Sequence, residues 1–256
     1  MLIKIKNRRK DCIRKMEIQE KMAVKPYKKA ADYSYTLGAF PTIELIKSKT
    51  AKVLGVYVHS TFTDLEQITL LCKERDIPVQ INDKLIARLS DKENVFVVGV
   101  FEKYKQKLDS LKPHIVLVNP GNMGNVGTIL RTAVGFGIHD IAFVSPAVDV
   151  FHPKAVRASM GALFRLRHEY FESFSEYRKN NPNQEVFCFM LNGTKQLSAA
   201  DCPKPKLFSL VFGNEATGLD DSFLTAGTSV IIPQSSEVDS LNLTIAAGIA
   251  MFLFIN

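Results

Sequence analysis

The sequence has 256 residues, 46% of them hydrophobic, which is enough to bury the core of one large domain or two small ones. Its four cysteines form no CxxC pair, which argues against a disulfide framework or a thiolate zinc site. The longest apolar stretch, 245–255, is too short to cross a bilayer, and the amino terminus lacks an apolar signal segment. We therefore expect a cytoplasmic protein with no membrane partner.

The net charge of +7 is unevenly distributed along the chain. Residues 1–30 contain 11 Lys and Arg against 3 Asp and Glu, which gives +8 and leaves −1 for the remainder. Such a basic tail can attract RNA phosphates by releasing counterions. It can equally be a solvated terminus, or an upstream extension with Met22 rather than Met1 as the native start.

The next segment, 31–105, alternates between β and α patterns and predicts a small α/β domain. Apolar runs predict strands at 53–58, 78–81 and 95–100. Helical spacing predicts one helix capped by Thr42 and two more at 65–75 and 84–89. Charge is high over 102–113, and Pro113 stops any helix at the end of 106–113. This segment is predicted to link two domains.

A second α/β domain is predicted over 114–256. Its expected strands lie at 114–118, 141–144, 185–190, 207–212 and 229–232, and its expected helices at 126–136, after Pro153 and at 241–254. The run 114–118 is apolar throughout, as is typical of a parallel strand covered on both faces. At the start of the last helix, Ser240 is a candidate N-cap.

Three polar loops follow predicted strands of this domain, at 119–125, 213–218 and 233–242. In an open α/β sheet, ligands bind outside the carboxyl ends of the strands, so these loops are expected to share one crevice. The glycines of the first loop are spaced GxxGxxG, which matches neither the dinucleotide fingerprint GxGxxG nor the phosphate loop GxxxxGK[ST]. The five histidines form no HExxH pair, so no metal is expected.

The segments NVGTILRTA (125–133), FGNEATGL (212–219) and IPQSSEVDSLNLT (232–244) together resemble the three signature motifs of the SpoU (TrmH-like) RNA ribose methyltransferases of the SPOUT superfamily. Their order and spacing are similar as well as their content. The resemblance covers 114–256 and implies a SPOUT methyltransferase domain with a parallel sheet and a trefoil knot. It also implies a homodimer, with 31–105 as a small α/β sandwich that binds the RNA substrate.

The resemblance also implies roles for individual residues. S-adenosyl-L-methionine is the implied cofactor, and the implied catalytic residues are Asn125, Arg131, Glu215, Ser240 and Asn242. The implied cofactor-binding residues are Asn192, Gly213, Ile232 and Leu241. Asn122 competes with Asn125 for the asparagine of the first motif. The spacing places Arg131 about a turn and a half inside its helix, within reach of a substrate phosphate or ribose.

The leading interpretation is an S-adenosylmethionine-dependent RNA 2′-O-ribose methyltransferase acting on ribosomal or transfer RNA. Two alternatives stay open, a SPOUT enzyme that methylates a base and a non-catalytic RNA-binding module. Since an arginine stays protonated, the proton of the ribose hydroxyl must leave through a phosphate, Ser240 or water. The motifs encode neither the RNA nor the nucleotide that is modified.

Overall fold

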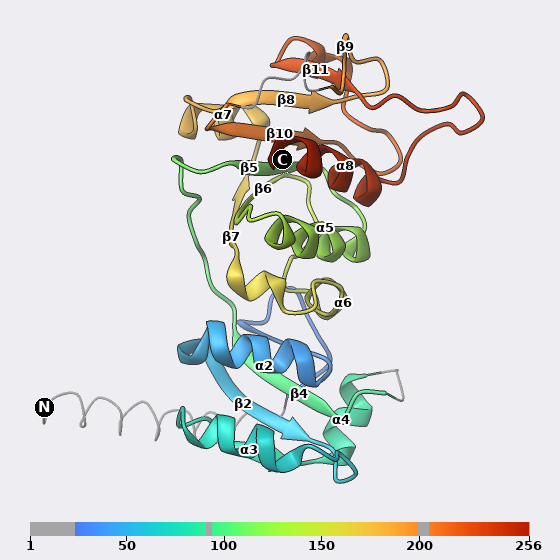
Figure 1. Ribbon diagram of the computed structural model, residues 1–256. Helices are drawn as coiled ribbons and strands as arrows, with labels where there is room; N and C mark the ends of the chain where they lie inside the picture. Colours follow the sequence, from blue (N-terminus) through green and yellow to red (C-terminus); the bar gives the residue numbers. More distant parts are fainter. Residues whose placement is uncertain (1–23, 91–93, 199–204, 256) are drawn as a thin grey trace, which may run out of the picture. The chain divides into compact units, whose positions relative to one another are not determined.

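The computed structural model describes residues 24–90, 94–198 and 205–255, and most of the basic tail lies outside them. Within these residues the chain forms two compact units. The first contains 24–104 and 151–164, and the second contains 105–150 and 165–255 (Figure 1). No helix among the described residues is long and apolar enough to span a membrane.

The first unit is built on a mixed four-stranded sheet with the order β1-β4-β2-β3. Only β2 and β3 pair in parallel. Its elements are β1 (Tyr33–Tyr35), α2 (Ala39–Ser48), β2 (Val53–Val58), α3 (Leu65–Lys73), β3 (Val79–Ile81), α4 (Asp83–Leu89) and β4 (Val97–Glu102). The predicted strands and helices of this part are therefore confirmed to within a few residues, whereas the short strand β1 was not predicted.

The N-cap of helix α2 is Gly38, four residues before the predicted cap, so the prediction of Thr42 as cap is wrong. Thr42 is buried in the first turns, where its hydroxyl donates to the Gly38 carbonyl oxygen at 2.7 Å. The helix packs closely on β4 at Gly99, where an added Cβ would lie 2.8 Å from Cγ2 of Thr42. A glycine at that position therefore allows the helix to approach the sheet.

Residues 151–164 complete the core of the first unit although they follow a strand of the second. They contain α6 (Pro153–Ala158) and continue into a 3-10 turn, Ala162–Arg165. The buried ring of Phe101 lies 5.9 Å from the ring of Phe151 and 5.2 Å from that of Phe164. The sequence pattern places this segment inside 114–256, but its aromatic side chains fill the apolar space beside β4.

The second unit contains a seven-stranded sheet in which all neighbouring strands are parallel, as predicted. The strand order is β7-β6-β5-β10-β8-β11-β9. Its strands are β5 (His114–Val118), β6 (Asp140–Val144), β7 (Arg167–Phe171), β8 (Glu185–Phe189), β9 (Lys195–Gln196), β10 (Phe208–Phe212) and β11 (Thr228–Ile231). Its helices are α5 (Met123–Gly135), α7 (Phe174–Asn180) and α8 (Leu243–Ile255), with a 3-10 turn at Asp221–Leu224.

Helices cover both faces of this sheet (Figure 1). On one face, Tyr177 of α7 and Phe223 belong to the same buried cluster as Val116 and Val211. On the other, α8 packs against α5 and β10, and the ring of Phe254 lies 5.2 Å from that of Phe208. Strand β10 lies between β5 and β8, so the chain returns to the middle of the sheet late in the sequence. The trefoil knot stays a prediction.

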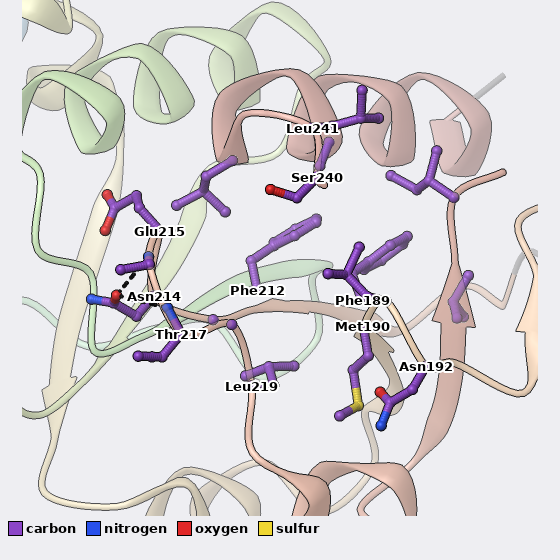
Figure 2. A pocket seen from close by; sticks show the side chains of 18 of the residues that line it. Phe189, Met190, Asn192, Phe212, Asn214, Glu215, Thr217, Leu219, Ser240 and Leu241 are labelled. Atoms are coloured by element: carbon purple, nitrogen blue, oxygen red, sulfur yellow. Dashed lines mark hydrogen bonds between the residues drawn. The ribbon is translucent and has the colours of Figure 1, made fainter. Parts of the chain in front are cut away.

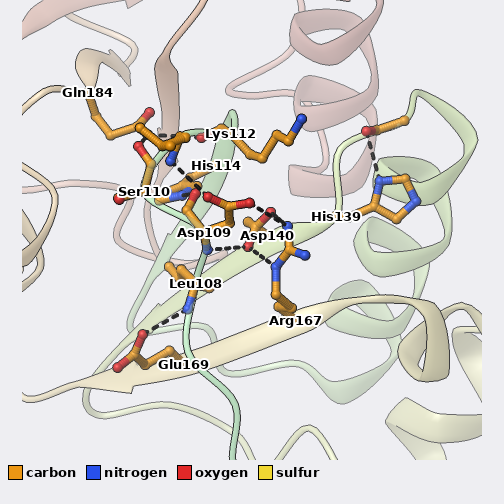
Figure 3. Close-up of polar contacts among 12 residues, drawn as sticks. Leu108, Asp109, Ser110, Lys112, His114, His139, Asp140, Arg167, Glu169 and Gln184 are labelled. Carbon is orange, nitrogen blue, oxygen red and sulfur yellow. Dashed lines mark hydrogen bonds and ion pairs between the residues drawn. The ribbon is translucent and has the colours of Figure 1, made fainter. Parts of the chain in front are cut away.

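The predicted link at 106–113 is fastened to the amino ends of the strands (Figure 3). The amide of Asp109 donates to the fully buried carboxylate of Asp140 at 2.8 Å, and Arg167 donates to the same carboxylate at 2.7 Å and 2.5 Å. The imidazole of His114 contacts the carbonyl oxygen of Asp109 at 2.9 Å, and its burial lowers the pKa of His114 below the usual 6.5. We call 106–113 the strap, since hydrogen bonds hold it across the amino ends of the strands.

Candidate active site

A cavity of about 340 Å³ opens beyond the carboxyl ends of β8, β10 and β11 (Figure 2). This volume lies within the range of small-molecule and cofactor sites. The chain segments that bound it are the turn after β8, the whole loop after β10, and the loop and first helical residues after β11. It is lined by Phe189, Met190, Leu191, Asn192, Phe212, Gly213, Asn214, Glu215, Ala216, Thr217, Gly218, Leu219, Val230, Ile232, Gln234, Ser240, Leu241, Leu243 and Ala246.

Six of the residues proposed from the sequence therefore line one cavity: Asn192, Gly213, Glu215, Ile232, Ser240 and Leu241. The expectation that the loops after separate strands converge is correct for the second and third motifs. Asn125, Arg131 and Asn242 do not line the cavity. Asn125 is nevertheless joined to it through a hydrogen bond to Glu215.

The loop after β10 is closed so tightly that Gly213 has no room for a side chain. A Cβ on Gly213 would lie 2.1 Å from the carbonyl carbon of Gly218. Two backbone hydrogen bonds between Asn214 and Gly218 hold the closure, at 3.2 Å and 2.9 Å, and Gly218 adopts φ +69°. The glycine of the second motif thus allows the loop to fold back on itself, and this closed loop forms part of the cavity wall.

Glu215 joins this loop to the first motif. Its carboxylate accepts from the backbone N–H groups of Gly121 at 3.0 Å and Asn122 at 3.1 Å, and from Nδ2 of Asn125 at 3.3 Å. Burial raises the pKa of the Glu215 carboxyl, but these hydrogen bonds outweigh it and leave the pKa below its ordinary value. The carboxylate is therefore ionised and already occupied by donors.

Asn214 forms a second connection between the same loops. Its Nδ2 donates to the carbonyl oxygen of Asn119, just beyond β5, at 2.7 Å. Its Oδ1 accepts from the amide of Ala216 at 2.8 Å, which shapes the turn of its own loop. Asn119 adopts φ +51°, a conformation that asparagine tolerates better than most residues. Two adjacent side chains thus clamp the start of the first motif against the cavity loop.

Asn122 and Asn125 have separate tasks. Asn122 is the N-cap of α5, because its side chain accepts from the amides of Gly124 at 2.8 Å and Asn125 at 3.1 Å. The helix consequently begins at Met123 and not near Val126 as predicted. Asn125 lies in the first turn, where its amide reaches Glu215. Of the two, only Asn125 uses its side chain to contact the second motif.

The third motif ends in a cap supplied by Asn242. Its Oδ1 accepts from the amide of Thr244 at 2.9 Å and from the Thr244 hydroxyl at 2.7 Å, so α8 begins at Leu243. The cap proposed from the sequence, Ser240, is wrong, because it lies too far before the unpaired N–H groups of the first turn. Ser240 is exposed and faces the cavity (Figure 2).

Arg131 is exposed on α5 and makes no hydrogen bond or ion pair with other described residues. It is the ninth residue of the helix, deeper than the turn and a half predicted, because the helix starts earlier. Asn192 does line the cavity, in the turn after β8, and its Nδ2 donates to Asp221 Oδ1 at 3.1 Å. Asn192 is thus held by an acidic partner that was not predicted.

Several residues of the cavity were missed by sequence reasoning. The stacked rings of Phe189 and Phe212, with centroids 4.7 Å apart, contribute from the ends of β8 and β10. Their strands were predicted, but an apolar strand residue gives no sign of which face a ligand uses. Thr217 and Gln234 could have been found, since both stand inside the motif segments.

The cavity combines apolar and aromatic walls with a few amide, hydroxyl and carboxylate groups, a composition typical of sites for nucleoside-like cofactors. Among residues 24–90, 94–198 and 205–255, no three His, Cys, Asp or Glu side chains gather as metal ligands would.

The comparisons with known proteins point to one family. A family model described as the SpoU rRNA Methylase family matches residues 112–252. An uncharacterized tRNA/rRNA methyltransferase of Synechocystis is 29% identical over 179 residues, which are 67% of this chain and 65% of that protein. The 23S rRNA (uridine(2479)-2'-O)-methyltransferase of Streptomyces viridochromogenes is 30% identical over 169 residues, 61% of this chain and 58% of that protein.

A similar fold is found in the crystal structure of an AdoMet-bound rRNA methyltransferase from Sinorhizobium meliloti. It is 26% identical, has a TM-score of 0.72 and aligns with 87% of either chain. The chain spans 65% and 58% of the length of the two curated relatives. Since the family model matches more than half of the sequence, including all three motif segments, this chain belongs to the SpoU rRNA methylase family.

Proposed function

We propose that the protein transfers a methyl group from S-adenosyl-L-methionine to the ribose 2′-hydroxyl of a nucleotide in structured RNA. The observation that carries the proposal is the single cavity formed by the loops after β8, β10 and β11, joined by Glu215 to the first motif. Relatives named as rRNA 2'-O-methyltransferases support the same assignment. The RNA would be ribosomal or transfer RNA.

The cavity suits S-adenosylmethionine in size and in the chemistry of its walls. Bound there, the cofactor supplies an electrophilic methyl group. Backbone groups of Gly213, Ile232 and Leu241 would bind the adenosine, since all three line the cavity and Gly213 holds the closed loop. Asn192 would bind the cofactor from the turn after β8.

The remaining motif residues would act on the RNA. Arg131 would bind a phosphate next to the target and stabilise the negative charge that develops on the ribose oxygen. Ser240 and Asn242 would face the methyl group and the ribose. The ribose oxygen would form a bond to the methyl carbon as the methyl–sulfur bond breaks, with its electron pair left on sulfur. The hydroxyl proton would leave through the phosphate, Ser240 or water, because an arginine does not accept protons.

Glu215 and Asn125 would position these groups and not transfer protons. The Glu215 carboxylate already accepts three hydrogen bonds, and its lowered pKa makes it a weak base. Through these bonds it holds the first turn of α5, the helix that carries Arg131. The alignment of reacting groups is itself a large contribution to the rate of such a displacement.

We also propose that the active form is a homodimer in the cytoplasm. Helix α8 is apolar on every side, yet Ile245, Ile249, Phe252 and Ile255 are 39–57% exposed in the single chain. A helix of this composition is normally covered all round, and a second copy of the chain would cover its outer face. Arg131 does not line the cavity of its own chain, which fits a site completed by two subunits.

The proposed activity is tested with methyl-labelled S-adenosylmethionine and unmodified bulk RNA, followed by complete alkaline hydrolysis and sizing of the labelled products. Alkali cleaves RNA through the free 2′-hydroxyl, so a methyl group at that position protects its own linkage. We expect the label in dinucleotides. Label in mononucleotides would identify a base methyltransferase, and no label in ribosomal, transfer or precursor RNA would favour a non-catalytic RNA-binding module.

A further inference from the structure

We infer that a basic surface on the first unit binds the phosphate backbone of the substrate RNA. We call it the lysine surface, and it consists of Lys25, Lys28, Lys29, Lys103 and Lys154. The inference rests on the proposed function, because it names where the same RNA is held. It differs from a general attraction by a basic tail, since these lysines come from three separate parts of the sequence.

The segment that carries the first three lysines is anchored on the unit. Val24 is only 2% exposed and belongs to the buried cluster that includes Tyr35 and Leu85. The backbone N–H of Lys25 donates to the Tyr33 hydroxyl at 3.0 Å, and that of Tyr27 donates to the Tyr35 hydroxyl at 3.1 Å. The lysine backbone is therefore held in place while the side chains extend outward.

Tyr27 brings Lys103 to the same place and packs against His152, which precedes Lys154 by two residues. The ammonium group of Lys103, just after β4, lies 4.6 Å from the centre of the Tyr27 ring. It donates to the Tyr27 hydroxyl at 2.7 Å and to the Lys29 carbonyl oxygen at 2.9 Å. The ring of His152 lies 5.0 Å from that of Tyr27, two residues before Lys154. Side chains far apart in the sequence thus gather around one tyrosine.

Four of the five lysines of this surface carry a charge that no ion pair in the described part of the chain neutralises. Lys25, Lys28, Lys29 and Lys154 are exposed and form no ion pair with other described residues. Asp32 and Glu102 lie near these lysines in the sequence, and Glu102 is paired with Lys52 at 3.0 Å. Grouped ammonium ions attract counterions, and a polyanion that displaces those counterions gains binding free energy.

The composition of the surface favours a phosphate backbone over a membrane. A basic surface that inserts into a lipid interface carries exposed apolar side chains beside its lysines. Here Val24 is buried, Tyr27 is half-buried, and no large apolar side chain between residues 24 and 33 is exposed. Ammonium groups spread over an ordered, polar surface suit the regularly spaced phosphates of a folded RNA.

The test compares two triple variants of the full chain that remove the same charge. The first is Lys25→Gln, Lys28→Gln and Lys29→Gln. The control is Lys47→Gln, Lys73→Gln and Lys84→Gln, which are also exposed and unpaired among the described residues but belong to α2, α3 and α4. The probe is unmodified bulk ribosomal RNA, and its affinity is measured between about 50 and 200 mM salt.

We expect the first variant to bind RNA at least about tenfold more weakly than the control at 100 mM salt. The slope of log affinity against log salt should fall by about two to three, since each lost phosphate contact removes about 0.7–0.9. Binding of S-adenosylmethionine should be the same in both variants. Equal losses in the two variants, or a loss confined to binding of acidic lipid vesicles, would overturn the inference.

The outcome can be separated from that of the proposed function. If the unaltered protein methylates RNA but the first variant binds RNA like the control, the proposed RNA-binding role of the lysine surface is wrong and the proposed activity is supported. If the unaltered protein binds RNA through these lysines but transfers no methyl group, the proposed activity is wrong and the role of the lysine surface is supported.

Discussion

Arg131 is exposed and lies on the helix whose first turn Glu215 holds in position. For Arg131→Lys we predict a fall in kcat of about 10²-fold with unchanged binding of S-adenosylmethionine. Lysine keeps the charge but loses the planar, bidentate donors that stabilise charge on a phosphate or alkoxide. Single-turnover methyl transfer with saturating RNA measures the effect. Full turnover of this variant would remove Arg131 from the mechanism.

Asn214 offers a sharper test of the coupling between loops. In Asn214→Asp, one oxygen still accepts from Ala216, but the other faces the Asn119 carbonyl oxygen, which Nδ2 contacted at 2.7 Å. One lost hydrogen bond and the new repulsion should lower the methyl-transfer rate about tenfold, equivalent to about 1.4 kcal/mol. The Kd of S-adenosylmethionine should change less than about threefold, because the turn that lines the cavity is kept.

The matched control for this change is Asn183→Asp, at an exposed asparagine with no hydrogen bond to other described residues. It introduces the same charge and should leave the rate unaltered. Asn214→Ser, which removes the repulsion, should recover part of the rate. If Asn214→Asp lost cofactor binding and rate in equal measure, a purely structural role would explain it.

At the scale of elements, the ends of helices decide where the motif residues lie. Asn122 and Asn242 each begin a helix by accepting from backbone N–H groups, and each leaves its neighbouring motif residues in the loop or first turn. The carboxyl ends of the strands carry the cavity and therefore form the candidate site, and the amino ends hold the strap.

The strap leads to a prediction about stability. In Asp140→Asn, Oδ1 can still accept from Asp109 and from Nε of Arg167, but the negative charge is lost and Oδ2, which accepts from Nη2 of Arg167, is replaced by an NH2 donor. The free energy of unfolding should fall by about 2–3 kcal/mol, because a charged hydrogen bond is lost and a buried donor then faces the guanidinium. Urea denaturation measures the change. The control Glu74→Gln breaks the exposed pair with Arg75 and should cost less than about 1 kcal/mol.

An effect of Asp140→Asn no larger than that of Glu74→Gln would mean that the strap is not held by this carboxylate. The side chain of Arg167 is 38% exposed, so water can replace part of what it loses. We therefore expect the loss in free energy of unfolding to be smaller than the cost of leaving a charge buried without a partner.

At the scale of the whole molecule, the outer face of α8 determines the proposed assembly. We predict that Phe252→Glu, at a side chain 57% exposed, converts a dimer into a monomer of 28.6 kDa in sedimentation experiments. A charge cannot be buried in an apolar contact without a partner. The control Leu111→Glu changes a side chain that is 70% exposed on the strap and should stay dimeric. A dimer formed by the Phe252 variant would assign the interface to another face.

Local sequence patterns predicted the parallel sheet and six of the residues that line the cavity at its carboxyl ends. This was possible because apolar runs, glycines and polar strand ends are local signals, and three motifs in the right order leave few alternatives. Glu215 was named from the second motif, and its carboxylate joins the loops after β5 and β10. The sequence patterns also placed most strands to within two residues.

Three features could be seen only in the folded chain: Asn122 caps α5, Asn242 and not Ser240 caps α8, and 151–164 belongs to the core of the first unit. Each of these depends on partners distant in the sequence or on which N–H groups stay unpaired. The same holds for the place of β10 between β5 and β8. The neighbours of a strand depend on packing across the whole sheet, so the strand order cannot be read from a local sequence pattern.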